Sequence, residues 1–232
     1  MNWMKKVAVA LVCLLPLGLQ AAKVDTLQVK SPSMNKSIEV VVVSPDMAAT
    51  EACPVIYLLH GYGGNARTWV GIKPDLPKIA DEKGIFFVCP DGKNTWYWDS
   101  PLNADVRYET FISDELVKYV DSHYKTVADR KGRAITGLSM GGHGAMWNGL
   151  RHSDVFSAAG STSGGVDIRP FPKNWEMSVQ IGEKAKYPEN WEKYTVINLV
   201  PTLRKDQIAL IFDCGDSDFF LEVNKNYHEA LL

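Results

Sequence analysis

Ser139 has the neighbours that a nucleophilic serine needs. The run GLSMG at positions 137–141 puts one glycine two residues before the serine and another two residues after it, and Gly142 follows. A short strand-like run at 134–136 precedes Ser139 and a helical pattern at 142–151 follows it, so we expect a sharp turn between a strand and a helix. Such a turn presents the serine Oγ on strained backbone, where side chains two residues away would collide. We predict that Ser139 is a catalytic nucleophile, the alternative being a structural glycine turn.

An ester attacked by a serine develops negative charge on its carbonyl oxygen, and this oxyanion needs hydrogen-bond donors. The backbone N–H of Met140 is one expected donor, because it lies at the positive end of the helix after Ser139. A second glycine-rich run, HGYGG at 60–64, follows an apolar strand-like run at 55–59. Its glycines let the backbone approach a substrate closely. We predict the N–H of Tyr62 as the second donor, and His60 and Gly61 as candidate substrate contacts, the alternative being a plain glycine-rich turn.

The acid that supports such a serine is expected later in the chain, on a loop after a strand. The run 208–213 has the pattern of that strand, and the loop CGDSDFF follows it at 214–220. Three aspartates compete for the role. Asp213 is still at the end of the strand, and Asp216 is in the turn, where an aspartate often bonds only its own backbone. We predict Asp218, because it lies past the turn and can reach back over the sheet.

The composition narrows the classes of function. The chain has 232 residues, of which 46% are apolar, and a formal net charge of −2 without long runs of one sign. This is enough for one globular domain with a sizeable core. A nucleic-acid partner is not expected, because such proteins usually carry a basic stripe. No Cys/His spacing resembles a metal site, and we predict neither a metal nor another cofactor.

The order of the elements predicts an α/β fold. Two β-branched runs at 26–29 and 38–43, joined by a turn, favour an antiparallel hairpin. After them, strand-like runs alternate with helical patterns, which indicates a mostly parallel sheet with helices on both faces. The strands are expected at 55–59, 85–88, 134–136, 155–159 and 208–213, and the helices at 76–83, 109–124 and 142–151. Residues 160–206 interrupt this alternation and are interpreted as a lid-like insertion.

The first 22 residues have the pattern of a secretory signal peptide. Two lysines precede an apolar run from Val7 to Leu19, and Ala21 and Ala22 supply small residues for cleavage. As a helix, this run of about 13 residues is too short for the roughly 30 Å of a hydrocarbon core. We expect a secreted or periplasmic protein, without a stable membrane anchor after cleavage, whose domain comprises residues 23–232.

Five motifs together resemble the esterase D branch of the α/β hydrolases. They are LLHGYGG (58–64), DGKNTWYWDSP (91–101), YETFISDELVKYVDSHY (108–124), RAITGLSMGGHGA (133–145) and FDCGDSDFF (212–220). That branch includes bacterial tributyrin-type, feruloyl and acetylxylan esterases and S-formylglutathione hydrolases. The resemblance implies an α/β-hydrolase fold and a serine carboxylic-ester hydrolase that works through an acyl-enzyme. It places the nucleophile on Ser139, the oxyanion donors on Met140 and Tyr62, and the acid on Asp218.

The histidine base of that family does not carry over. In its relatives the base lies some tens of residues beyond the acid, whereas Asp218 is followed here only by residues 219–232, which have the pattern of one amphipathic helix. His228 is in the middle of that helix, and His60 and His143 are better interpreted as packing or loop-fixing residues. We expect a C-terminally truncated chain that lacks the triad histidine, the last strand and the final helix. Weak or absent activity should follow, because a serine hydroxyl needs a base to take its proton.

Aromatic residues suggest the class of substrate. Trp96 and Trp98 follow the strand expected at 85–88, and the insertion contributes more aromatic side chains. Such residues suit sugar faces and aryl acyl groups, so the expected substrate is a short-chain or carbohydrate-linked ester, acetyl or feruloyl, on a small molecule or a polysaccharide. Two alternatives stay open: a non-catalytic carbohydrate-binding protein with the same fold, and an acyltransferase acting on a sugar hydroxyl.

Overall fold

The computed structural model describes residues 22–232 of the chain. The predicted signal peptide lies outside these residues, apart from Ala22. Within the described part, no helix combines the length and apolar character that crossing a membrane requires.

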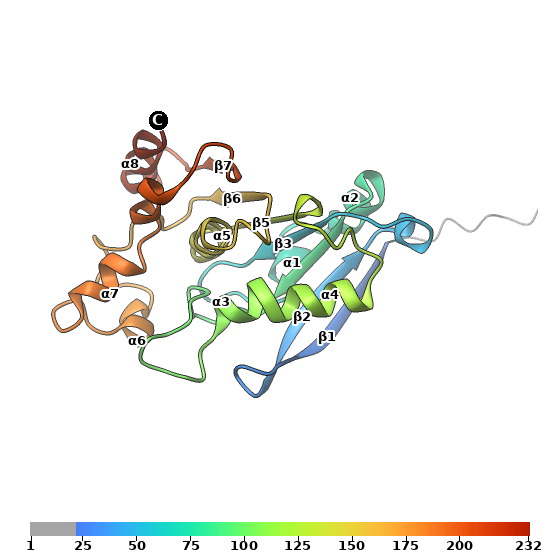
Figure 1. Ribbon diagram of the computed structural model, residues 1–232, viewed down its shortest axis with the longest axis horizontal. Helices are drawn as coiled ribbons and strands as arrows, with labels where there is room; N and C mark the ends of the chain where they lie inside the picture. Colours follow the sequence, from blue (N-terminus) through green and yellow to red (C-terminus); the bar gives the residue numbers. More distant parts are fainter. Residues whose placement is uncertain (1–21) are drawn as a thin grey trace, which may run out of the picture.

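A seven-stranded sheet forms the centre of the molecule (Figure 1). The strand order is β1-β2-β4-β3-β5-β6-β7; the pairs β1/β2 and β2/β4 are antiparallel and the other pairs are parallel. The strands are β1 (Lys23–Ser31), β2 (Lys36–Ser44), β3 (Val55–Leu59), β4 (Phe86–Pro90), β5 (Arg133–Gly137), β6 (Ala158–Thr162) and β7 (Ala209–Asp213). The predicted N-terminal hairpin and the predicted α/β-hydrolase fold class are both confirmed.

Helices cover both faces of the sheet. Alternate residues of the central strands point to opposite faces, so each face contributes apolar side chains to its own cluster. Val41, Val43 and Leu58 pack with α1 (Thr68–Ile72) and α2 (Leu76–Lys83) on one face. Val40, Val42 and Tyr57 pack in the larger cluster on the other face, with α4 (Leu116–His123), α5 (Met140–Arg151) and α8 (Leu221–Leu231). A short α3 (Tyr108–Thr110) and a π-turn at Phe111–Glu115 lead into α4, so one nearly continuous helical segment occupies the predicted span 109–124.

The segment predicted as a lid-like insertion has its own short helices. Residues 160–162 belong to β6, so we use "the insertion" for residues 163–206. It contains α6 (Met177–Ile181), α7 (Pro188–Lys193) and a 3-10 helix (Val196–Thr202). Trp191 is fully buried and its Nε1 donates to the carbonyl of Gly182 (2.9 Å). The insertion is therefore packed against the rest of the molecule and contributes to its core. Two further 3-10 turns lie at Asp46–Ala49 and Arg130–Gly132.

The strand predicted at 155–159 is wrong by three residues. The observed strand β6 starts at Ala158, and the N–H groups of Val155 and Phe156 donate to the carbonyl of His152 in the turn after α5. The Phe156 ring packs edge-on against Tyr57 (centroids 5.7 Å apart). The apolar character of 155–156 thus reflects packing in a turn. The strand itself is made of small residues.

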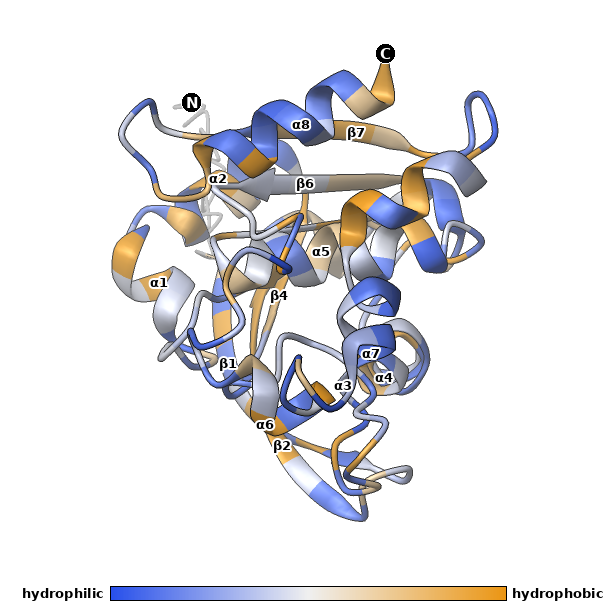
Figure 2. Ribbon diagram, turned by 90° about the vertical axis from the view of Figure 1, so that its left-hand side faces the viewer, coloured by the Kyte–Doolittle hydropathy of each residue, from blue (hydrophilic) through white to orange (hydrophobic). Residues whose placement is uncertain are grey.

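Strand β7 is at the edge of the sheet beside α8 (Figure 2). Its residues alternate between exposed and partly buried, and the Ile211 side chain is 75% exposed. Figure 2 shows that β7 has apolar character although it pairs only with β6 in the described part of the chain.

Candidate active site

Ser139 lies on the sharp turn between β5 and α5. Its backbone has φ 56° and ψ −116°, a region that costs free energy for any residue other than glycine. The Ser139 N–H donates to the carbonyl of Thr162 (2.9 Å), which holds the turn against the end of β6. Strained backbone at a position fixed by its neighbours is typical of functional sites.

The glycines on either side of Ser139 are required by steric contact. A Cβ atom on Gly137 would lie 2.3 Å from the carbonyl oxygen of Gly141, and one on Gly141 would lie 2.1 Å from the carbonyl oxygen of Leu59. Both contacts are with backbone atoms, which cannot move aside as a flexible side chain can. The steric reason given for the GLSMG pattern is therefore confirmed.

The HGYGG loop lies directly beside this turn. A Cβ atom on Gly61 would be 3.5 Å from the Cβ of Ser139. The N–H groups of Gly63 and Gly64 donate to Asn94 Oδ1 (2.9 Å) and to the carbonyl of Gly61 (3.0 Å). Within residues 22–232, by contrast, the N–H groups of Tyr62 and Met140 have no hydrogen-bond acceptor. Two backbone donors therefore stay available close to Ser139.

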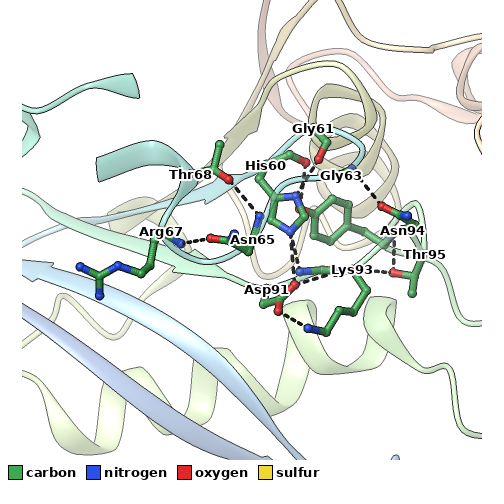
Figure 3. A network of polar contacts seen from close by, with 12 residues as sticks. His60, Gly61, Gly63, Asn65, Arg67, Thr68, Asp91, Lys93, Asn94 and Thr95 are labelled. Atoms are coloured by element: carbon green, nitrogen blue, oxygen red, sulfur yellow. Dashed lines mark hydrogen bonds and ion pairs between the residues drawn. The ribbon is translucent and has the colours of Figure 1, made fainter. Parts of the chain in front are cut away.

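The His60 side chain holds the HGYGG loop from inside the molecule (Figure 3). It is 1% exposed, and its Nε2 accepts from the Gly92 N–H (2.9 Å). Nδ1 therefore carries the proton and donates to the Gly61 carbonyl (2.7 Å). The Tyr97 hydroxyl donates to the His60 carbonyl (3.0 Å). The prediction of His60 as a substrate contact is corrected: its ring is enclosed and supports the loop, whereas Gly61 lies next to Ser139.

Asp91, which sequence reasoning did not single out, completes this support. Its carboxylate lies 3.6 Å from His60 Nε2 and accepts from the backbone N–H (2.9 Å) and Nζ (2.5 Å) of Lys93. Burial alone would raise the pKa of Asp91, but the hydrogen bonds and the positive charge of Lys93 outweigh it and hold the pKa below its usual range. The position directly after a buried strand, in the motif DGK, is the signal in the sequence that could have identified it.

Trp96 and Trp98 are packing residues, which corrects their prediction as substrate contacts. They are 1% and 0% exposed, and their rings stack on each other with centroids 5.6 Å apart. Trp98 Nε1 donates to His143 Nε2 (2.8 Å), and His143 Nδ1 donates to the Gly165 carbonyl (2.8 Å). Burial lowers the pKa of His143 to about 4, so this imidazole is neutral near pH 7. Fully enclosed indoles cannot touch a ligand.

Asp218 lies on the loop after β7, as the sequence predicts, but its carboxylate is engaged locally. Oδ1 accepts from the Phe220 N–H (2.8 Å), and the Asp218 N–H donates to the Gly215 carbonyl (3.0 Å). Of the two competing aspartates, Asp213 accepts a long hydrogen bond from Thr162 Oγ1 (3.3 Å). In the described part of the chain, no hydrogen bond or ion pair joins Asp218 to a histidine.

None of the histidines is hydrogen-bonded to Ser139 among residues 22–232. The ring nitrogens of His60 and His143 are all engaged, His152 contacts Glu109 (2.8 Å), and His123 contacts the Tyr119 carbonyl (2.8 Å). His228 lies on α8 beside the Phe212 ring (centroids 6.2 Å apart). The described site thus brings together Ser139, Met140 and the Gly61–Tyr62 loop, but no base.

Comparison with known proteins identifies the family. The Esterase family model matches residues 31–231. This chain belongs to that esterase family. The resemblance of its motifs to the esterase D-like branch of the α/β hydrolases is thereby confirmed.

Relatives of the chain include two curated esterases. Esterase Rv1288 of Mycobacterium tuberculosis is 30% identical over 61% of this chain, and the matched region spans 32% of that relative's length. An acetyl esterase of Caldicellulosiruptor saccharolyticus is 25% identical over 78% of this chain and 72% of its own length. Among solved structures, a ferulic acid esterase superposes with a TM-score of 0.74 and 29% identity, covering 91% of this chain and 86% of that one.

Proposed function

We propose that this enzyme hydrolyses acetyl or feruloyl esters attached to carbohydrates through an acyl-enzyme formed on Ser139. The observation that carries the proposal is the strained turn at Ser139 beside the Gly61–Tyr62 loop, with the Tyr62 and Met140 N–H groups lacking an acceptor among residues 22–232. Donors of this kind, fixed before the reaction starts, stabilise charge that develops only in the transition state.

In the proposed reaction, Ser139 Oγ attacks the ester carbonyl carbon while a base takes the hydroxyl proton. The carbonyl oxygen becomes an oxyanion and accepts from Tyr62 N–H and Met140 N–H. Collapse of the tetrahedral intermediate breaks the bond to the alcohol oxygen, and the alcohol leaves with the proton returned by the base. Water then attacks the acyl-enzyme in the same way and releases the carboxylic acid and free Ser139.

We attribute the base to a histidine that residues 22–232 do not include, with Asp218 as its orienting acid. Two observations support this assignment. No described histidine is hydrogen-bonded to Ser139, and strand β7, which leads into the Asp218 loop, pairs only with β6 among the described strands and leaves Ile211 75% exposed. A chain with Ser139 and its donors but no base should react slowly, on the order of 10⁶-fold below a complete triad.

The substrate class rests on the relatives, whose names include an acetyl esterase and a ferulic acid esterase. Both acyl groups are uncharged. We further propose that the enzyme is exported, as the pattern of residues 1–22 predicts. Polysaccharide esters are substrates that an exported hydrolase would meet.

Chemical rescue tests the mechanism on the 232-residue chain itself. Hydrolysis of p-nitrophenyl acetate and methyl ferulate is measured with and without about 50 mM imidazole, which can act as a diffusible base. We expect imidazole to raise the Ser139-dependent rate at least about tenfold, because it supplies the missing proton acceptor.

Ser139→Ala is the matched control, since it removes only the hydroxyl oxygen. It should show no more than the reaction of imidazole with the substrate in solution. Equal rates for the wild type and Ser139→Ala at every imidazole concentration would reject Ser139 as the nucleophile. Transfer of the acyl group to an added sugar in preference to water would instead identify an acyltransferase.

A further inference from the structure

The Trp175–Glu176 segment of the insertion contacts both sides of the site around Ser139. Both residues have positive φ values, 47° and 53°, which side chains other than glycine rarely adopt. Each such residue costs about 1–3 kcal/mol and persists only where its surroundings impose it. The segment starts α6, and the Glu176 side chain is exposed.

Glu176 is joined to the HGYGG loop through Asn94. Asn94 Nδ2 donates to Glu176 Oε2 (3.2 Å), and Asn94 Oδ1 accepts from the Gly63 N–H (2.9 Å). Figure 3 shows the second of these bonds. The pKa of the Tyr62 phenol is raised by burial and then by the neighbouring Glu176 carboxylate. The loop is thus tied to the insertion on the side of its predicted oxyanion donor.

Asn94 removes one competing donor from the loop. Among the described residues, the Gly63 N–H is bonded to Asn94 and the Gly64 N–H to the Gly61 carbonyl, whereas the Gly61 and Tyr62 N–H groups have no acceptor. A rotation of the peptide between Tyr62 and Gly63 would break the bond to Asn94. That peptide carries the Tyr62 carbonyl and is joined at the Tyr62 Cα to the peptide that carries the Tyr62 N–H, so holding Gly63 restricts the Tyr62 N–H through the two dihedral angles at Tyr62.

Trp175 contacts the loop on the other side of the site. Its ring packs on Phe219 and Phe220, with centroids 5.1 and 5.2 Å away. These two residues directly follow Asp218, and the Phe220 N–H is the donor that holds the Asp218 carboxylate. The Trp175 carbonyl accepts from Trp96 Nε1 (3.1 Å). Trp96 also has a positive φ (58°), so two strained segments meet at this bond.

We propose that Asn94, Trp175 and Glu176 are positioning residues of the esterase: Glu176 acts through Asn94 to set the Tyr62 donor, and Trp175 sets the Asp218 loop. The inference rests on the proposed roles of Tyr62 and Asp218. The proposal gives the insertion a part in catalysis, because the insertion connects the HGYGG loop to the Asp218 loop.

Amide hydrogen exchange on the 232-residue chain tests the positioning without requiring turnover. Asn94→Ala should speed exchange at Gly63 about tenfold or more, since the protecting bond is lost, and Glu176→Ala should do so about three- to tenfold. Glu176→Gln keeps an oxygen acceptor for Asn94 and should stay within about twofold of the wild type. Trp175→Ala should speed exchange at Phe220, whereas Trp175→Phe should restore most of the protection.

Glu183→Ala is the matched control, because Glu183 is an acidic residue of the same insertion that pairs only with Lys186 among the described residues. It should leave Gly63 and Phe220 unchanged. Unchanged Gly63 exchange in both Asn94→Ala and Glu176→Ala would overturn the link from Glu176 to the loop. Unchanged Phe220 exchange in Trp175→Ala would overturn the role of Trp175.

The catalytic consequence is measured separately by imidazole-assisted hydrolysis. Asn94→Ala and Glu176→Ala should lower kcat about tenfold or more with little change in KM, and Glu176→Gln should recover it, because a transition-state donor is displaced while substrate binding is kept. Faster exchange with unchanged kcat would show that the contacts are structural only. If the wild type itself shows no Ser139-dependent turnover, the proposed function fails, and the exchange data still decide whether these residues hold the loops.

Discussion

The two sides of the site differ in how many neighbouring strands hold them and in how deeply their residues are buried. On the elbow side, comprising β3, β5 and the start of α5, strand β5 pairs with strands on both edges and its side chains are buried or half-buried. On the acid side, comprising β7, residues 214–220 and α8, strand β7 pairs only with β6 among the described strands and alternates between exposed and half-buried. The nucleophile is therefore held by a complete set of neighbours, while the acid is held by few.

This difference shows which part of the catalytic geometry is fixed independently of the base. The Ser139 turn depends on contacts between backbone atoms of Gly137, Gly141 and Leu59, all within the elbow side. Among the described residues, the Asp218 carboxylate accepts one hydrogen bond, from the Phe220 N–H, and the Asp218 backbone bonds only to Gly215 and Leu221 of the same loop and helix start. We expect the elbow side to form and hold Ser139 whether or not a base is present, and the acid side to be the more easily displaced.

Matched isoleucines test the comparison with the largest expected effect. Ile135 on β5 is 1% exposed and Ile211 on β7 is 75% exposed. Ile135→Ala should lower the free energy of unfolding by about 3–5 kcal/mol, because it leaves a cavity in the core. Ile211→Ala should change it by less than about 0.5 kcal/mol. Urea denaturation measures both, and similar losses would contradict the contrast between the two sides.

A glycine pair tests the steric argument for the elbow. Gly141→Ala puts a Cβ atom 2.1 Å from the Leu59 carbonyl oxygen. It should lower the free energy of unfolding by about 3 kcal/mol, at the upper end for overpacking, and should also lower the imidazole-assisted activity. Gly71→Ala is the control, since Gly71 is also helical and a Cβ there meets nothing within 4 Å. It should stabilise the protein by about 0.5–1 kcal/mol. Equal effects would mean that the elbow tolerates a side chain.

Much of the elbow side could be predicted from the sequence because its determinants are local. Glycines at fixed distances from Ser139, a strand-like run before it and a helical pattern after it are all visible within 20 residues. Strand β6 was harder, because it is made of small residues. A Cβ atom on Gly149 of α5 would lie 2.6 Å from the Ala159 Cβ, so close packing of helix on strand requires small residues where a sequence pattern looks for apolar ones.

The contacts around the site could not be predicted because they join distant segments. Asn94 and Glu176 are separated by 82 positions, and nothing in either neighbourhood indicates the other. Trp96 and Trp98 lie in a region that the sequence predicts to face the substrate, yet both side chains are buried. The backbone at Trp96 and Tyr97 is left-handed. Residue type alone does not distinguish an aromatic ring that binds a ligand from one that fills the core.

His143 makes the stability of the elbow side depend on pH. Burial lowers its pKa from 6.5 to about 4, so the unfolded chain binds a proton between these pH values that the folded chain does not. Stability from this group is therefore fully present above pH 6.5 and is lost as the pH falls toward 4. The loss between pH 7 and pH 4.5 should be about 2 kcal/mol.

His143→Gln cannot be protonated and should show a correspondingly smaller loss, whereas His123→Gln, at an exposed position, should follow the wild type. Free energies of unfolding from urea titrations at the two pH values measure the loss for each variant. An equal loss in the wild type and His143→Gln would show that this imidazole is accessible to water, contrary to its place beneath the Ser139 turn.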